Sequence, residues 1–188
     1  MDTQVASSSA ITEWLARAHP TPEHARAEWT VQGVALLPLG RQFAAVRIPG
    51  SLVHAALGSA DADVVAELLS LRLRGPVIHD HRSTGPTYYA LIQWHAGLIW
   101  DRGETAPCLQ SDTYLGVPHI DRREPPGTYW VAPPRYEGDL CRPQAVRDLI
   151  DAGRQQFGQE NETLPGRTKG ESRSRSLACP AGSEGVAR

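Results

Sequence analysis

The sequence predicts an α+β fold, a single domain in which a mixed or antiparallel sheet is flanked by helices. Its 188 residues are enough for one domain with its own core and too few to expect two. An apolar fraction of 40% together with 17 Gly and 15 Pro indicates a globular chain with many turns, unlike a simple helical bundle. Segments of helical periodicity also interrupt several short strand-like runs, which is typical of α+β proteins.

We expect the ordered domain to span residues 9–157. Residues 1–8 are polar and are predicted to be a disordered leader. Beyond Gly158 the chain is rich in Glu, Gly, Ser, Arg and Pro, and it has too few apolar side chains to offset the entropy cost of ordering. Residues 158–188 are therefore predicted to be a disordered tail.

Two short helices are predicted first. Ser9 is a candidate cap for the first helix, whose apolar face would consist of Ile11, Trp14, Leu15 and Ala18. The second begins at Thr21, has Pro22 at its first helical position and runs to about Trp29. We expect both helices to pack on the sheet through their tryptophans.

A β-hairpin is predicted next, at the centre of the fold. Residues 31–39 have the pattern of a mostly buried strand, and residues 43–48 have the pattern of its partner. Gly40 and Arg41 between them predict a tight turn.

Helices are then expected at residues 49–57 and, capped by Asp61, at residues 62–74. Later strands are predicted at residues 77–79, 87–94, 113–117 and 128–132. Residues 95–100 would continue the second of these strands past a bend at Gly97. A last helix from about Pro143 closes the domain.

Charge and cysteine content exclude several classes of protein. The formal net charge is −2, so no global field attracts a polyanion, and nucleic-acid binding would need a local patch. Cys108, Cys141 and Cys179 form no C-x-x-C pair, which favours neither a disulfide framework nor a zinc site and fits a reducing, cytoplasmic setting. No signal peptide and no apolar run of roughly 20 residues is present, so membrane insertion is not expected.

Four sequence runs carry a resemblance to a known family. They lie at residues 36–49 (LLPLGRQFAAVRIP), 75–78 (GPVI), 112–118 (DTYLGVP) and 128–133 (TYWVAP). In this order they resemble the N-terminal domain of actinobacterial bifunctional DNA primase/polymerases, over roughly residues 11–155. The resemblance implies the archaeo-eukaryotic primase fold, an RRM-like sheet packed with helices, which in active members copies nucleic acid with divalent metal ions.

The chain departs from that family where the family holds its metal. The matching strand is residues 43–49, and Ala44 or Ala45 and Arg47 stand where the resemblance places acidic residues. Nucleotidyl transfer needs carboxylates converging on Mg²⁺, and no predicted strand interior contains Asp or Glu. Primase or polymerase activity is therefore not expected. No cofactor is predicted. Mg²⁺ or Mn²⁺ would bind only if the loop residues Asp101, Asp112 and Asp121 together form a metal site.

His79 and His81 are the pair of residues most specifically indicated by the sequence as a metal-binding or phosphate-contacting site. If the strand continues through both, they lie on one face and could share a metal ion, or one could contact a nucleotide phosphate, as a histidine does in the resembled family. A shared metal needs a third ligand, for which His95, His119 and Asp121 are the candidates. The alternative is a polar turn that leaves the sheet.

Four arginines form a second candidate site. Arg41, Arg47, Arg122 and Arg123 would make a phosphate-contacting surface if the hairpin and residues 118–127 are neighbours. The alternative is a solvated rim. Strand aromatics such as Tyr88, Tyr89 and Trp130 could stack on bases if one sheet face is open, or could pack in the core.

The leading hypothesis is a catalytically degenerate primase/polymerase-like domain that retains nucleotide or single-stranded nucleic-acid binding in replication or mobile-element maintenance. One alternative is a protein-interaction module that keeps only the scaffold and contacts a partner through residues 118–134 or the tail. Another is a metal-dependent enzyme using His79 and His81. An open, basic sheet face would favour nucleic acid, and a face closed by the N-terminal helices would favour the interaction module.

Overall fold

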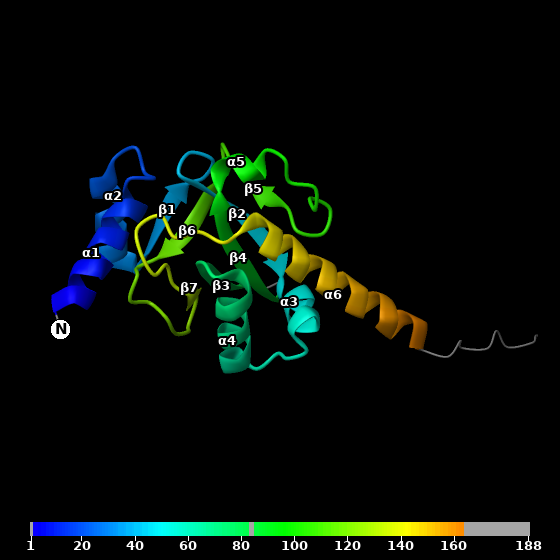
Figure 1. The fold of residues 1–188 in the computed structure, drawn as a ribbon. Coiled ribbons are helices and arrows are strands. Elements are labelled where there is room, and N and C mark those ends of the chain that lie inside the picture. The colour runs from blue at the N-terminus through cyan, green and yellow to red at the C-terminus, as the bar shows by residue number, and fades with distance from the viewer. Residues whose placement is uncertain (1, 83–84, 164–188) are drawn as a thin grey trace, which may run out of the picture.

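The computed structural model describes residues 2–82 and 85–163, and within these ranges the chain folds into helices and two antiparallel sheets (Figure 1). The helices are α1 (Asp2–Ala16), α2 (Pro22–Gln32), α3 (Gly50–Leu57), α4 (Ala62–Leu73), α5 (Trp94–Gly97) and α6 (Pro143–Thr163). The strands are β1 (Val34–Pro38), β2 (Phe43–Pro49), β3 (Val77–Arg82), β4 (Gly85–Gln93), β5 (Cys108–Leu109), β6 (Tyr114–Pro118) and β7 (Tyr129–Ala132). The predicted α+β single domain is confirmed.

The larger sheet has the strand order β5-β2-β4-β3-β7, and β1 and β6 pair in a smaller one. Side chains alternate between the two faces of the larger sheet. In β2, Phe43 and Ala45 face one core, whereas Ala44, Val46 and Ile48 face the other. Because β2 and β4 are covered on both sides, both strands are buried along most of their length.

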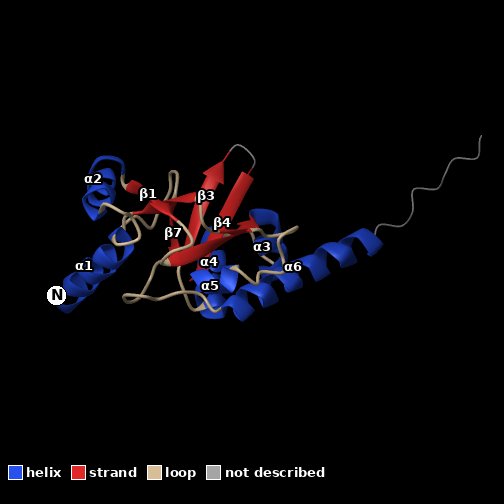
Figure 2. Cartoon of the chain, turned by 90° about the horizontal axis from the view of Figure 1, so that it is seen from above, coloured by secondary structure: helices blue, strands red, loops and turns tan. Residues whose placement is uncertain are grey.

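Helices and the small sheet cover both faces of the larger sheet. One core contains Leu15, Trp29 and Leu37, from α1, α2 and β1. The other contains side chains of α3, α4 and α6, among them Leu52, Leu69 and Ile150. Figure 2 shows α1 and α2 on one side of the strands and α3 and α6 on the other. The N-terminal helices thus close one face, so the described part of the sheet offers no open platform for stacking bases.

Local signals in the sequence correctly predicted features of three of these helices, α1, α2 and α4. Both tryptophans of the N-terminal pair pack on the sheets as expected. The Trp14 ring lies 5.8 Å from the Phe43 ring, and the Trp29 indole donates a hydrogen bond of 2.9 Å to the Val117 carbonyl. At α4, the Asp61 carboxylate accepts hydrogen bonds from the first-turn backbone N–H groups, which confirms it as the cap.

The predicted hairpin is wrong. The turn itself is tight, with Gly40 at φ +86° and its N–H donating to the Phe43 carbonyl at 2.8 Å. Yet β1 pairs with β6, from Val34 opposite Pro118 to Pro38 opposite Tyr114, and β2 pairs with β4 and β5. Because β2 has partners on both edges, no edge remains for β1, and the turn carries the chain from one sheet into the other.

Other boundaries also differ. Residues 94–97 form the helix α5 and not a continued strand, because the chain turns at Gly97, whose carbonyl accepts a hydrogen bond of 2.6 Å from the Gln110 side chain. Helix α1 begins at Asp2, within the predicted leader, and α6 continues to Thr163, into the predicted tail. The rest of that tail, residues 164–188, lies outside the described residues. Among the described helices, none combines the length and the hydropathy that a membrane-spanning segment requires.

Candidate functional site

A cleft of about 340 Å³ opens where β3, β4 and β7 meet the first turns of α4 and the segment before β7. Its lining includes the ionisable or aromatic residues His54, Asp63, His79, Tyr88, Arg123 and Tyr129. A larger hollow of about 670 Å³ lies beside it and shares His54, but is lined mainly by small residues of α3 and by Phe157. The smaller cleft therefore holds more of the groups that recognise a ligand.

The sheet register aligns three rings along one side of this cleft. His79 on β3 lies opposite Tyr88 on β4 and opposite Tyr129 on β7. Its ring centroid is 5.0 Å from that of Tyr88 and 4.9 Å from that of Tyr129. Each strand contributes one ring to the row, so the position of the rings is fixed by backbone pairing.

His79 is buried and incompletely bonded. The residue is 8% exposed, and its Nδ1 has no hydrogen-bond partner among the described residues. Leaving a buried polar atom unpaired costs about 1–3 kcal/mol, and such atoms in folded proteins call for an explanation. Burial first, and the neighbouring His81 second, lower the pKa of His79. The imidazole is thus neutral near pH 7, and its Nδ1, which has less than 1 Å² of accessible surface, can act as either a donor or an acceptor.

Tyr88 joins this row to α3. Its hydroxyl lies 3.2 Å from Nε2 of His54, and burial raises the pKa of Tyr88 to about 12. Burial also lowers the pKa of His54. Both side chains are therefore uncharged at neutral pH, and the inner part of the cleft has aromatic, neutral walls.

Charged side chains also line this cleft. Arg123 is exposed and is the single arginine among the lining residues of the described chain, which contain no lysine. Asp63, in the first turn of α4, and Glu124 are also lining residues. One cation and two carboxylates do not form a basic pocket.

The prediction for His79 and His81 is confirmed in its geometry. Strand β3 continues through both residues, and their rings share a face with centroids 6.2 Å apart. His81 is exposed and does not line the cleft. Among the described residues no group of three or more His, Cys, Asp or Glu side chains could hold a metal ion, so no third ligand joins the pair.

The four predicted arginines lie in different surroundings. Arg47 is exposed on β2 opposite Tyr89, whose ring faces the core away from His79, and Arg41 is exposed in the turn between β1 and β2. Arg122 donates to the carbonyls of Pro126 at 2.7 Å and Gln32 at 3.4 Å, which ties its loop to the end of α2. Only Arg123 lies at the cleft that His79 lines.

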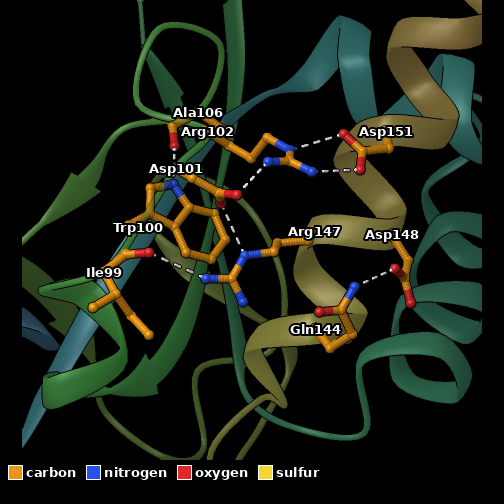
Figure 3. Close-up of polar contacts among 9 residues, drawn as sticks. All are labelled: Ile99, Trp100, Asp101, Arg102, Ala106, Gln144, Arg147, Asp148 and Asp151. Carbon is orange, nitrogen blue, oxygen red and sulfur yellow. Dashed lines mark hydrogen bonds and ion pairs between the residues drawn. The ribbon is translucent and has the colours of Figure 1, made fainter.

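The loop acids that could rebuild a metal site have other roles or lie elsewhere. Asp101 accepts hydrogen bonds from Arg102 at 2.6 Å and from Arg147 at 2.9 Å (Figure 3). Arg102 in turn makes two bonds of 2.9 Å to Asp151 on α6. These ion pairs fasten the loop after α5 to α6. Asp112 adopts φ +65° in the turn before β6, and Asp121 lies 3.5 Å from His119.

Sequence reasoning missed His54, and it did not place the strand aromatics Tyr88 and Tyr129 beside His79. His54, Tyr88 and Tyr129 come from separate elements, and only the strand register brings the tyrosines beside His79. The available signal was the tyrosine in each neighbouring strand, which could be aligned with His79 only if the strand order was known. No family model, curated protein or solved structure matches this chain.

Proposed function

We propose that this chain is a cytoplasmic, catalytically degenerate primase/polymerase-like domain that binds a nucleotide and does not transfer nucleotidyl groups. Its setting would be replication or the maintenance of a mobile element. The observation that supports binding is that His79, whose buried Nδ1 has no hydrogen-bond partner among the described residues, lines a cleft together with Tyr88 and Tyr129. Such convergent polar and aromatic groups in a concave site are the usual features of a small-molecule site.

The composition of β2 is the reason to expect no polymerase chemistry. In the resembled family the acids that hold the metal would occupy this strand, and here its central positions are Ala44, Ala45 and Arg47. Without carboxylates that bind divalent metal, the charge that develops on the transferred phosphate is not neutralised. The domain would retain a place for the nucleotide and lack the means to activate it.

The covered sheet favours a single nucleotide over a nucleic-acid strand. Strand-binding domains use an exposed aromatic sheet or a continuous basic groove. Here Tyr89 and Trp130 are buried in the core between the sheet and the N-terminal helices. Arg47 and Arg123 are on surfaces that do not combine into one groove around His79. We therefore expect weak or no binding of single-stranded DNA.

The test compares binding with catalysis. Calorimetric titration with AMP, ATP and dATP should detect binding of at least one of them to the wild type. His79→Leu, which keeps a buried side chain of similar size, should weaken it about tenfold or more through loss of a buried hydrogen bond. His81→Ala, on the same face of β3 but outside the cleft, is the matched control and should bind as the wild type does.

Primer extension with Mg²⁺ or Mn²⁺ should give no product above background. Robust extension would overturn the assignment as catalytically degenerate. Absence of binding by all three nucleotides would overturn the proposed function itself.

The sheet face closed by the N-terminal helices and several exposed apolar side chains favour a second candidate, a protein-interaction module. Trp94, Leu98 and Ile99 are 42%, 67% and 76% exposed, and they lie in or just after α5. Figure 3 shows the segment from Ile99 onward held on α6, where Arg147 contacts the Ile99 carbonyl and lies over the Trp100 ring. Rigid exposed apolar groups of this kind mark protein contacts. The double variant Leu98→Asp with Ile99→Asp should then lose a partner that His79→Leu retains in quantitative affinity purification.

A further inference from the structure

The structure points to a more specific ligand, and this inference rests on the proposed function. We infer that the cleft recognises the uncharged nucleoside part of its ligand, a planar base with its sugar, and prefers a ligand with no phosphate or one phosphate over a triphosphate. His79 would bond an edge of the base, and the rings beside it would contact the base plane. Recognition would thus lie in groups other than the phosphates.

The dimensions of the cleft suit one small ligand. Its volume of about 340 Å³ is near the lower end of the roughly 300–1,000 Å³ typical of ligand sites. A nucleoside would occupy most of that space, and an extended triphosphate would have to leave it. The rings of His79, Tyr88 and Tyr129 are inclined to one another, by 66° for His79 and Tyr88 and by 44° for His79 and Tyr129, and they offer apolar edges and faces against which a base can pack.

The buried Nδ1 of His79 suits a neutral polar atom better than a phosphate. The Nδ1 atom has less than 1 Å² of accessible surface, so a ligand atom that bonds to it must itself be largely desolvated, which costs far more for a charged oxygen than for a ring nitrogen or a carbonyl. Burial also lowers the pKa of His79, so the imidazole does not supply a compensating positive charge at neutral pH. A heterocycle edge, which offers donors and acceptors without net charge, matches this group.

The charged residues of the lining limit the number of phosphates. Arg123 can pair with one phosphate, whereas Asp63 and Glu124 would repel further negative charge. The same two carboxylates can accept hydrogen bonds from sugar hydroxyls. A ligand that presents hydroxyls and at most one phosphate therefore satisfies the lining, and each added phosphate opposes it.

The experiment is a calorimetric series on the whole chain with the four common ribonucleosides and, for the tightest of them, its mono- and triphosphate, without divalent metal. We expect at least one nucleoside to bind, the monophosphate to bind as well or up to about tenfold better, and the triphosphate to bind more weakly than the monophosphate. Arg123→Ala should remove the advantage of the monophosphate and leave nucleoside affinity within about twofold, because Arg123 meets only the phosphate.

Variants at His79 and Tyr129 test the contact with the base. His79→Leu should weaken nucleoside binding about tenfold or more. Tyr129 is half-buried on another strand, and Tyr129→Leu should also weaken binding, so the test does not depend on whether His79→Leu folds. His81→Ala is the control, and thermal unfolding of each variant establishes that it folds.

The outcomes separate the inference from the function on which it rests. Affinity that rises from nucleoside to monophosphate to triphosphate, with the nucleosides silent, would overturn the inference and leave nucleotide binding in place. Silence from nucleosides and nucleotides alike would overturn both. Nucleoside binding that survives both His79→Leu and Tyr129→Leu would place the ligand elsewhere and overturn the inference.

Discussion

The imidazole of His79 lies 5.0 Å from the ring of Tyr88, centroid to centroid, and the two residues are directly opposite each other on β3 and β4. Tyr88 also contacts His54 of α3 through its hydroxyl, 3.2 Å from Nε2. A helix and two strands therefore meet around a buried imidazole whose Nδ1 has no bond within the described chain. The account of function given above depends on this arrangement.

Stability should depend on pH through His79. Its folded-state pKa is lowered below the ordinary 6.5, by burial and by His81 and His54, while Asp80 acts in the opposite direction. Since the unfolded chain then binds the proton more readily, the stabilisation is complete above about pH 6.5 and is lost as the pH falls through the folded-state pKa. His79 would contribute a slope of at most about 1.4 kcal/mol per pH unit.

Thermal unfolding between about pH 5 and pH 7.5 measures this effect across the range where histidine titrates. The wild type should lose stability more steeply than His79→Leu as the pH falls. His54, whose pKa burial also lowers, would leave a smaller slope of the same sign in the variant. Equal slopes in the two proteins would contradict the assignment of His79 as a neutral, buried group.

A second prediction concerns the close contact between α3 and α6. A Cβ on Gly153 would lie 2.5 Å from the Leu52 carbonyl oxygen, which is backbone and cannot move aside alone. Gly153→Ala should therefore destabilise the domain by about 1–3 kcal/mol, despite the better helix propensity of alanine.

Gly103 supplies the matched control for that substitution. No atom lies within 4 Å of a Cβ built at Gly103, so Gly103→Ala should change stability by no more than about 0.5 kcal/mol. Chemical denaturation of both variants gives the comparison. If Gly153→Ala were as stable as Gly103→Ala, the packing of α6 on α3 described here would be wrong.

A third prediction concerns the ion pairs in Figure 3. Arg102 donates to both carboxylate oxygens of Asp151, and this contact lowers the pKa of Asp151. The side chains are 25% and 39% exposed, so solvent screens the pair. A double-mutant cycle with Arg102→Ala and Asp151→Ala should give a small favourable coupling energy, because the two-bond geometry favours the pair while solvent screens it. A coupling energy near zero would contradict a fixed loop after α5.

Local signals predicted most elements, and the sequence failed where partners are distant. Asp61 as a cap and Trp29 on a buried helical face depend on neighbours within a turn or two, and both are confirmed. The Gly40 turn was also recognised, but its conformation does not determine which strands pair. That choice follows from competition for the edges of β2, which β4 and β5 occupy.

Some features of the candidate site could likewise be predicted from local sequence patterns, and others depend on distant strands. The common face of His79 and His81 follows from alternation along one strand, so it could be predicted. The ring row with Tyr129 depends on β3 pairing with β7, across about 50 residues of chain, and no local pattern specifies it. The predicted arginine surface required residues 118–127 to lie beside the predicted hairpin. The pairing of β1 with β6 places Val34 opposite Pro118, whereas the β1 end nearest the turn that holds Arg41 lies opposite Tyr114.

The central claim is that a nucleotide contacts the buried nitrogen of His79. Nitrogen NMR of the histidine rings in labelled protein, with the His79 signals assigned through their loss in His79→Leu, tests it most directly. The account predicts that the monophosphate of the tightest-binding nucleoside shifts the Nδ1 signal of His79 in a saturable manner and leaves that of His81 nearly unchanged. Saturable binding of this nucleotide with an unmoved His79 signal, or no binding by any of the four common ribonucleoside monophosphates, would contradict it.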